Sequence, residues 1–149
     1  IHPTAKYVHM LRDGRDAINS LLKLGWYTRI DDACWRWETS VRMTQKLGQK
    51  LGDDSFLEIR YENLTRKPEK DIKRLCSFLK IQYNPKMLNP QQTAEKIMKN
   101  TIVTPQHKNI LKPINAIRIG NWEQELDVLQ KVQIHKYIGK TLRELNYLD

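Results

Sequence analysis

The sequence predicts an α/β fold in which parallel strands are flanked by helices. Two segments have the apolar or alternating pattern of strands: Tyr7–Leu11, which is expected to be a buried strand, and Phe56–Tyr61. Stretches with apolar residues at helical spacing follow both segments, and this alternation is typical of a parallel sheet. Two strands are too few for a stable sheet, so we expect the remaining strands to precede residue 1.

The first strand leads into a turn, Arg12-Asp13-Gly14-Arg15-Asp16, and then into a helix for which Asp16 is the expected N-cap. Strand, turn and helix in this order direct backbone N–H groups and the positive end of a helix dipole toward an anion. Arg12, at the strand end, and Ser20, about one turn into the helix, can therefore converge on one phosphate. The alternative is that Arg12 and Arg15 are solvated turn charges and Ser20 is an ordinary helix residue.

Most of the remaining chain is predicted to be helical. A long helix starts at Asp31 or Asp32, and its two tryptophans, Trp35 and Trp37, are expected to pack rather than to bind a cofactor. The other expected elements are a loop over 62–65, a helix over 68–79 that begins with proline, short helical pieces near 84–90, a long functional loop over 99–115 and a final helix over about 127–145.

The composition indicates a globular protein that favours anionic partners. Among 149 residues, 26 are Lys or Arg and 17 are Asp or Glu, which leaves a formal net charge of +9. The basic residues are dispersed and no nucleic-acid-binding motif is present, so we do not expect a nucleic-acid partner. No apolar run reaches membrane-spanning length. Cys34 and Cys76 lack metal-site spacing, so we expect reduced core cysteines and no metal.

Three segments, Arg12–Ser20, Arg60–Leu64 and Lys112–Trp122, resemble in their order the sulfotransferases that use 3'-phosphoadenosine 5'-phosphosulfate (PAPS). In the first segment, serine follows the first arginine by eight residues, and the resemblance implies that Arg12 and Ser20 grip the 3'-phosphate. The second resembles a family segment whose tyrosine lies near the adenine, which implies that role for Tyr61. The alternative is that Tyr61 caps the strand and packs under the following loop.

The third segment resembles the basic loop that closes over the 3'-phosphate in this family, followed by Gly-x-Trp entering a helix. The resemblance makes Lys112 and Arg118 alternative candidates for the phosphate contact and includes Gly120 in the nucleotide site. The Lys-Pro-x-Asn pattern is closest to the tyrosylprotein branch, and Gly-Asn-Trp to bacterial members. The Arg-Lys-Gly of the cytosolic small-molecule branch is Arg118-Ile119-Gly120 here, so the lysine is missing at that place.

The resemblance implies a P-loop-NTPase-like parallel sheet that serves sulfuryl transfer from PAPS to a hydroxyl or amine, with adenosine 3',5'-bisphosphate as the product. The Gly-rich loop for the 5'-phosphosulfate and the usual catalytic base precede the first segment in this family. We therefore expect residues 1–149 to be the C-terminal part of a single sulfotransferase domain, truncated at its N-terminus. The catalytic residue is unassigned, and His9 and His107 are expected to be structural or surface residues.

The resemblance leaves the acceptor open among small molecules, sugars and peptides, and it leaves the oligomeric state open. We expect the protein in the cytoplasm, or in the Golgi lumen if the enzyme is of the tyrosylprotein type. Two other functions remain as alternatives: a non-catalytic basic module that binds anions with the same fold, and a nucleotide kinase. The kinase is disfavoured because the sequence contains no Gly-x-x-x-x-Gly-Lys phosphate loop.

Overall fold

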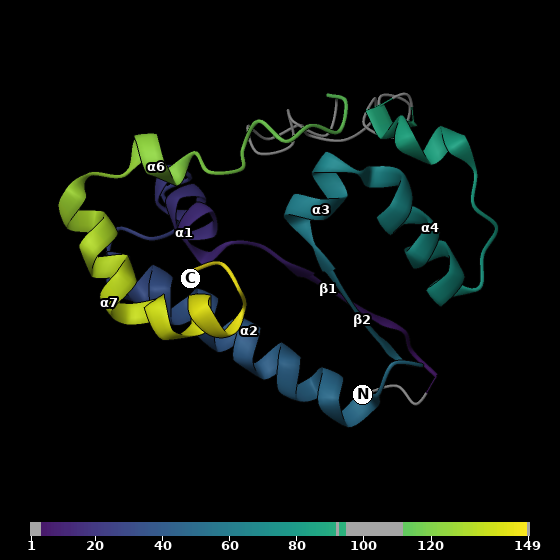
Figure 1. Ribbon diagram of the computed structural model, residues 1–149, viewed down its shortest axis with the longest axis horizontal. Helices are drawn as coiled ribbons and strands as arrows, with labels where there is room; N and C mark the ends of the chain where they lie inside the picture. The colour runs from purple at the N-terminus through teal and green to yellow at the C-terminus, as the bar shows by residue number, and fades with distance from the viewer. Residues whose placement is uncertain (1–3, 92, 95–111, 149) are drawn as a thin grey trace. The chain divides into compact units, whose positions relative to one another are not determined.

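The computed structural model describes residues 4–91, 93–94 and 112–148, which form parts of two compact units (Figure 1). The first unit joins residues 1–58 to residues 117–149, and the second covers residues 59–116. His107 and most of the loop expected over 99–115 lie outside the described residues. The expectation that residues 1–149 belong to a single domain stays a prediction.

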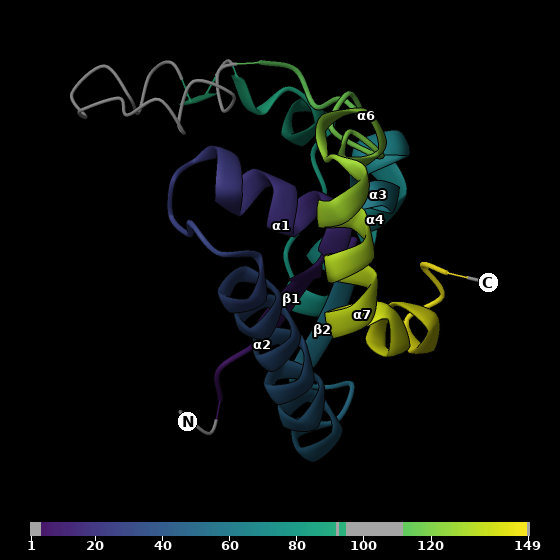
Figure 2. The ribbon, with the colours of Figure 1, turned by 90° about the vertical axis from the view of Figure 1, so that its left-hand side faces the viewer.

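Two strands, β1 (Tyr7–Leu11) and β2 (Phe56–Arg60), pair in a parallel two-stranded sheet and run side by side in Figures 1 and 2. Helices flank this sheet, so the predicted α/β class is confirmed. The expectation of a buried β1 is wrong for alternate residues, because Leu11 is buried while Val8 and Met10 are exposed. Successive side chains point to opposite faces of a strand, and the described residues cover only one face of β1.

Four helices complete the first unit: α1 (Gly14–Lys23), α2 (Ile30–Leu51), α6 (Trp122–Glu125) and α7 (Val128–Glu144). α2 packs against both α1 and α7, as both ribbon views show (Figures 1 and 2). Their buried apolar faces form one core, which also receives the end of β1. Its members are Leu11, Ile18, Ala33, Cys34, Trp37, Val41, Leu126, Ile134, Ile138, Leu142 and Leu145.

Helix α1 begins three residues earlier than expected, because Asp13 and not Asp16 is its N-cap. The Asp13 carboxylate accepts a hydrogen bond from the backbone N–H of Arg15, at 2.9 Å. Gly14 then forms the first helical position against the core. A Cβ at Gly14 would lie 2.6 Å from Ile138 Cδ1 and 2.9 Å from the Trp37 ring. Glycine is therefore required here by close packing between α1, α2 and α7.

Gly14→Ala is expected to lower the free energy of unfolding by about 1–3 kcal/mol, the usual cost of overpacking a core. Gly139→Ala is the matched control in α7, where a new Cβ would meet the His135 ring at an ordinary 3.4 Å. Because alanine favours the helix, this control should be neutral or stabilising by up to about 1 kcal/mol. Urea unfolding of both variants measures the difference, and equal effects would contradict the packing explanation.

The two long helices follow their expected bounds closely, but one expectation about buried residues in α2 is wrong. α2 starts at Ile30, and α7 starts after Asp127, whose side chain and that of Gln130 form a capping box. Trp37 is buried as expected, whereas the expectation for Trp35 is wrong, because this residue is 67% exposed. Trp35 lies only two positions from Trp37, so the two side chains leave the helix on different faces.

The second unit contains α3 (Tyr61–Arg66), α4 (Pro68–Leu79) and the 3₁₀ helix η1 (Pro85–Leu88). The bounds predicted for α4 are confirmed, but the loop predicted over 62–65 is wrong, since these residues form α3. The Thr65 hydroxyl donates to the carbonyl of Tyr61 at 2.9 Å, and Lys67 N donates to Asn63 O at 2.8 Å. These two bonds close a helical turn that ends just before Pro68. Cys34 in the first unit and Cys76 in the second are free and buried, as expected.

Candidate functional site

A small cavity lies along the flank of α1, between this helix and the segment that leads into α6. Its volume is about 160 Å³, below the ~300–1,000 Å³ of pockets that enclose a whole small ligand. It therefore suits one polar group of a larger ligand. The lining residues are Arg12, Asp16, Asn19, Ser20, Lys23, Leu24, Arg118, Asn121 and Glu125.

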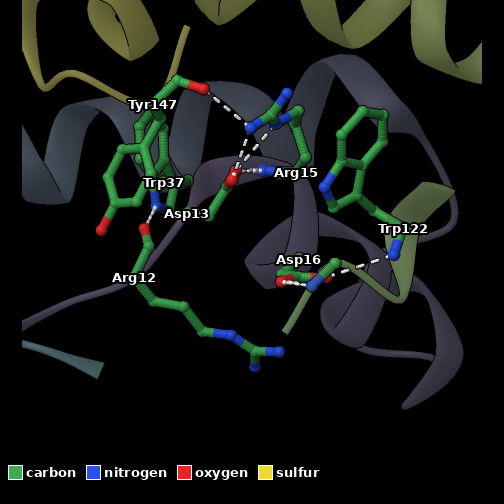
Figure 3. A network of polar contacts seen from close by, with 8 residues as sticks. Arg12, Asp13, Arg15, Asp16, Trp37, Trp122 and Tyr147 are labelled. Carbon is green, nitrogen blue, oxygen red and sulfur yellow. Dashed lines mark hydrogen bonds and ion pairs between the residues drawn. The ribbon is translucent and has the colours of Figure 1, made fainter. Parts of the chain in front are cut away.

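Arg12 is held in place from both ends. Its carbonyl oxygen accepts a hydrogen bond from the indole N–H of Trp37, at 3.3 Å, and its Nη2 donates to the carbonyl of Arg118, at 2.9 Å. Figure 3 shows the Arg12 side chain extending away from the pair that Asp13 forms with Arg15. These contacts fix the guanidinium at the cavity and bring the segment around residue 118 to the same place.

Asp16 anchors the turn that precedes α6 (Figure 3). This residue is 2% exposed, and its carboxylate accepts hydrogen bonds from Gly120 N at 2.8 Å and from Trp122 N at 3.1 Å. Gly120 has a φ of +78°, in the region where side chains with a Cβ are strained. The turn therefore depends on a buried carboxylate and a glycine, and it positions Arg118 two residues before that glycine.

Arg15 is committed to the structure and does not line the cavity. Its Nε and Nη2 contact the two oxygens of Asp13 at 3.0 and 2.7 Å, and Nη2 also donates to Tyr147 O at 2.9 Å. The guanidinium lies 4.2 Å from the centroid of the Trp122 ring (Figure 3). The sequence alternative of a solvated turn charge is thus wrong for Arg15, which ties the start of α1 to the C-terminal segment.

Glu125 places a second carboxylate in the cavity. Its two oxygens contact the side chains of two α1 residues: Asn19 Nδ2 at 2.5 Å and Lys23 Nζ at 2.6 Å. The hydrogen bond from Lys23, followed by that from Asn19, lowers the pKa of the Glu125 carboxyl. Glu125 is therefore an anion at neutral pH, 29% exposed in its side chain.

The structure brings three of the six predicted site residues to one cavity: Arg12, Ser20 and Arg118. Gly120 lies in the adjoining turn, where its N–H is bound by Asp16, and it does not line the cavity. Tyr61 and Lys112 belong to the second unit, Tyr61 at the start of α3 and Lys112 exposed, and their roles stay predictions.

Sequence reasoning did not assign the other six residues that line the cavity, which are Asp16, Asn19, Lys23, Leu24, Asn121 and Glu125. Asp16, Asn19, Ser20 and Lys23 have the i, i+3, i+4, i+7 spacing of one helix face, and this signal was available once Ser20 had been singled out. The cavity lies on this flank of α1, so side chains rather than the helix N-terminus supply its positive charge.

The donor set of the cavity suits a phosphate-like anion. It combines two guanidinium groups and one ammonium group with a hydroxyl and two amides, all of which can donate hydrogen bonds. Of its two carboxylates, Asp16 is occupied by backbone N–H groups. Within the described ranges, no group of three or more His, Cys, Asp or Glu residues is arranged to hold a metal ion. No helix in the described part of the chain has the length and apolar character to cross a membrane.

Comparison with known proteins points to one family. The model of a family described as "Sulfotransferase family" matches residues 1–85. Protein-tyrosine sulfotransferase A of Caenorhabditis elegans is 27% identical over 128 residues, which cover 82% of this chain and 34% of that protein. Protein-tyrosine sulfotransferase 1 of Danio rerio is also 27% identical, and that match covers 99% of this chain and 43% of the relative.

Among solved structures, the sulfotransferase domain from the Synechococcus PCC 7002 olefin synthase is similar, with a TM-score of 0.67 and 25% identity. That match covers 91% of this chain and 49% of the solved chain. The family resemblance stated from the sequence is thereby confirmed. The chain spans less than half the length of these relatives.

Proposed function

The chain belongs to the sulfotransferase family, and we propose that it binds the 3'-phosphate of PAPS in the cavity beside α1. The observation that carries this proposal is that Arg12 and Ser20, from one segment, and Arg118, about a hundred residues later, line one cavity. Two of these residues bring positive charge and the third a hydroxyl, which together match the charge and acceptor oxygens of a phosphate.

In this proposal each of the three residues has a defined part. Arg12 is the rigid contact, because its backbone and its Nη2 are both held by hydrogen bonds. Arg118 closes over the phosphate from the turn that Asp16 anchors, and the Ser20 hydroxyl donates from the flank of α1. A planar guanidinium can give two parallel hydrogen bonds to a phosphate, which fixes the orientation of the nucleotide.

PAPS would supply the sulfuryl group, and the described residues would bind and orient its nucleotide end. Tyr61 is proposed to lie near the adenine. Holding the donor in a defined orientation is itself a large part of catalysis for a group transfer. No described residue is assigned as the catalytic base or as a contact to the 5'-phosphosulfate.

Similarity to protein-tyrosine sulfotransferases of several animals supports tyrosine in a protein or peptide as the acceptor class. The compartment follows from the acceptor: the Golgi lumen for a tyrosylprotein-type enzyme and the cytoplasm otherwise. Small phenols and sugars are the competing acceptors.

Transfer from labelled PAPS by the full-length protein tests the proposed function. The acceptors are a tyrosine peptide, the same peptide with phenylalanine for tyrosine, a small phenol and a sugar. We expect label on the tyrosine peptide only. A protein that binds ATP in preference to adenosine 3',5'-bisphosphate would instead be a nucleotide kinase. Binding that strengthens with polyanion length, without nucleotide selectivity, would indicate a non-catalytic module.

Arg118→Ala and Lys112→Ala are expected to differ in the full-length protein, because Arg118 is among the residues that line the cavity and Lys112 is not. Arg118→Ala should raise the KM for PAPS by about tenfold and reduce the salt dependence of nucleotide binding. Lys112→Ala should have the smaller effect. If Lys112→Ala weakens nucleotide binding more than Arg118→Ala does, the phosphate contact belongs to Lys112. If neither substitution changes nucleotide binding, the segment 112–122 does not contact the 3'-phosphate.

A further inference from the structure

Glu125 is at odds with a cavity that receives a phosphate. Its carboxylate lies among the same lining residues as Arg12, Ser20 and Arg118, and a phosphate brought into this small space would face its negative charge. Like charges repel strongly at a few ångströms in a partly buried site. The position of Glu125 therefore needs an explanation that the proposed phosphate contacts do not provide.

The Glu125 carboxylate binds two hydrogen-bond donors of α1. One oxygen accepts from Asn19 and the other pairs with Lys23, at 2.5 and 2.6 Å. Both partners lie on the cavity face of α1, within one turn of Ser20. An ammonium and a carboxamide N–H are also good donors to phosphate oxygens. The carboxylate thus occupies two donors that a phosphate in the same cavity would use.

The local structure allows the carboxylate to leave without unfolding the site. Glu125 is the last residue of the four-residue helix α6, and its side chain is 29% exposed, so it borders solvent. The next residue, Leu126, is 5% exposed and packed in the core, which fixes the backbone at this point. A rotation of the Glu125 side chain alone would turn the carboxylate outward and release Asn19 and Lys23.

We propose that Glu125 is a built-in competitor of the 3'-phosphate: its carboxylate binds Asn19 and Lys23 and is displaced from them when the nucleotide binds. The inference rests on the proposed function. It assigns Asn19 and Lys23 as further phosphate contacts and makes Glu125 a residue that weakens nucleotide binding. The cost of displacing the Glu125 side chain from Lys23 and Asn19 is subtracted once from the total gain of the phosphate contacts.

The test is the affinity of the full-length protein for adenosine 3',5'-bisphosphate and for AMP, measured by calorimetry with the Glu125→Gln variant. Glutamine has nearly the same shape without the charge. We expect the variant to bind the bisphosphate about five- to tenfold more tightly, because one repulsive charge and one competing ion pair are removed. The affinity for AMP, which has no 3'-phosphate, should stay unchanged.

Glu123→Gln is the matched control. It removes the same charge from the same short helix, and Glu123 does not line the cavity. Because net charge changes equally in both variants, a gain shared by the two would be a general charge effect and would overturn the proposal. Thermal unfolding of both variants verifies that each remains folded at the temperature of the binding experiment.

Lys23→Met separates competition from positioning. If Glu125 competes for Lys23, the gain from Glu125→Gln should shrink in the Lys23→Met background, which a double-mutant cycle measures. If Glu125 instead orients Lys23 for the phosphate, Glu125→Gln alone should weaken bisphosphate binding, and that result would overturn the proposal. Failure of the proposed function has a different outcome: the unmodified protein would bind the bisphosphate and AMP equally.

Discussion

Arg12→Ala is expected to weaken the binding of adenosine 3',5'-bisphosphate to the full-length protein by about 2 kcal/mol or more, the size of a charge-assisted contact. The substitution removes a guanidinium that lines the cavity and also the hydrogen bond that holds the Arg118 carbonyl. AMP lacks the 3'-phosphate, so its affinity should hardly change. Calorimetry with both nucleotides measures this selectivity.

Two further variants control this prediction. Arg36→Ala removes the same charge from an exposed position of α2 and should leave both affinities unchanged. Arg12→Lys keeps the charge but not the planar pair of donors, so its bisphosphate affinity should fall between those of Arg12 and Arg12→Ala. Equal losses for the bisphosphate and AMP in Arg12→Ala would mean that Arg12 does not contact the 3'-phosphate.

Asp16→Ala is expected to lower the free energy of unfolding by about 2–4 kcal/mol, since buried backbone donors lose a charged acceptor. Its carboxylate is 2% exposed and binds the N–H groups of both Gly120 and Trp122. Asp16→Asn keeps one acceptor oxygen and should lose less. Denaturant unfolding gives the free energies, and amide hydrogen exchange at Gly120 and Trp122 should become faster in both variants.

Asp53→Ala is the control for this stability effect, because Asp53 is an exposed acid in the turn between α2 and β2. Its stability should change by less than about 0.5 kcal/mol. Unchanged exchange at Gly120 and Trp122 in Asp16→Ala would show that the turn before α6 is held by other contacts.

Elements with local signals in the sequence were the ones that could be predicted. Pro68 and the acids after it mark the start of α4, and Asp127 with Gln130 marks the start of α7. The first strand, the long helix α2 and the α/β class follow from apolar spacing in the same way. The loop expected over 62–65 failed because asparagine and threonine favour turns in general, while here the Thr65 hydroxyl bonds within its own helix.

Only the cavity residues that belong to recognisable motifs could be predicted from the sequence. Arg12 and Ser20 lie close together in sequence, and Arg118 was a candidate through the family resemblance. Asp16 resembled an N-cap, but its partners Gly120 and Trp122 are 104 and 106 residues away. Asn19 likewise meets Glu125 across 106 residues. Contacts of this range depend on how α1 packs against the C-terminal segment, and local patterns carry no information about them.

The most direct test of the central claim is a crystal structure of the full-length protein bound to adenosine 3',5'-bisphosphate. The account predicts that the 3'-phosphate lies in the cavity beside α1, within hydrogen-bonding distance of the Arg12 guanidinium and the Ser20 hydroxyl, with Arg118 closing over it. A nucleotide whose 3'-phosphate lies elsewhere, with the cavity lined by Arg12 and Ser20 left empty, would contradict it.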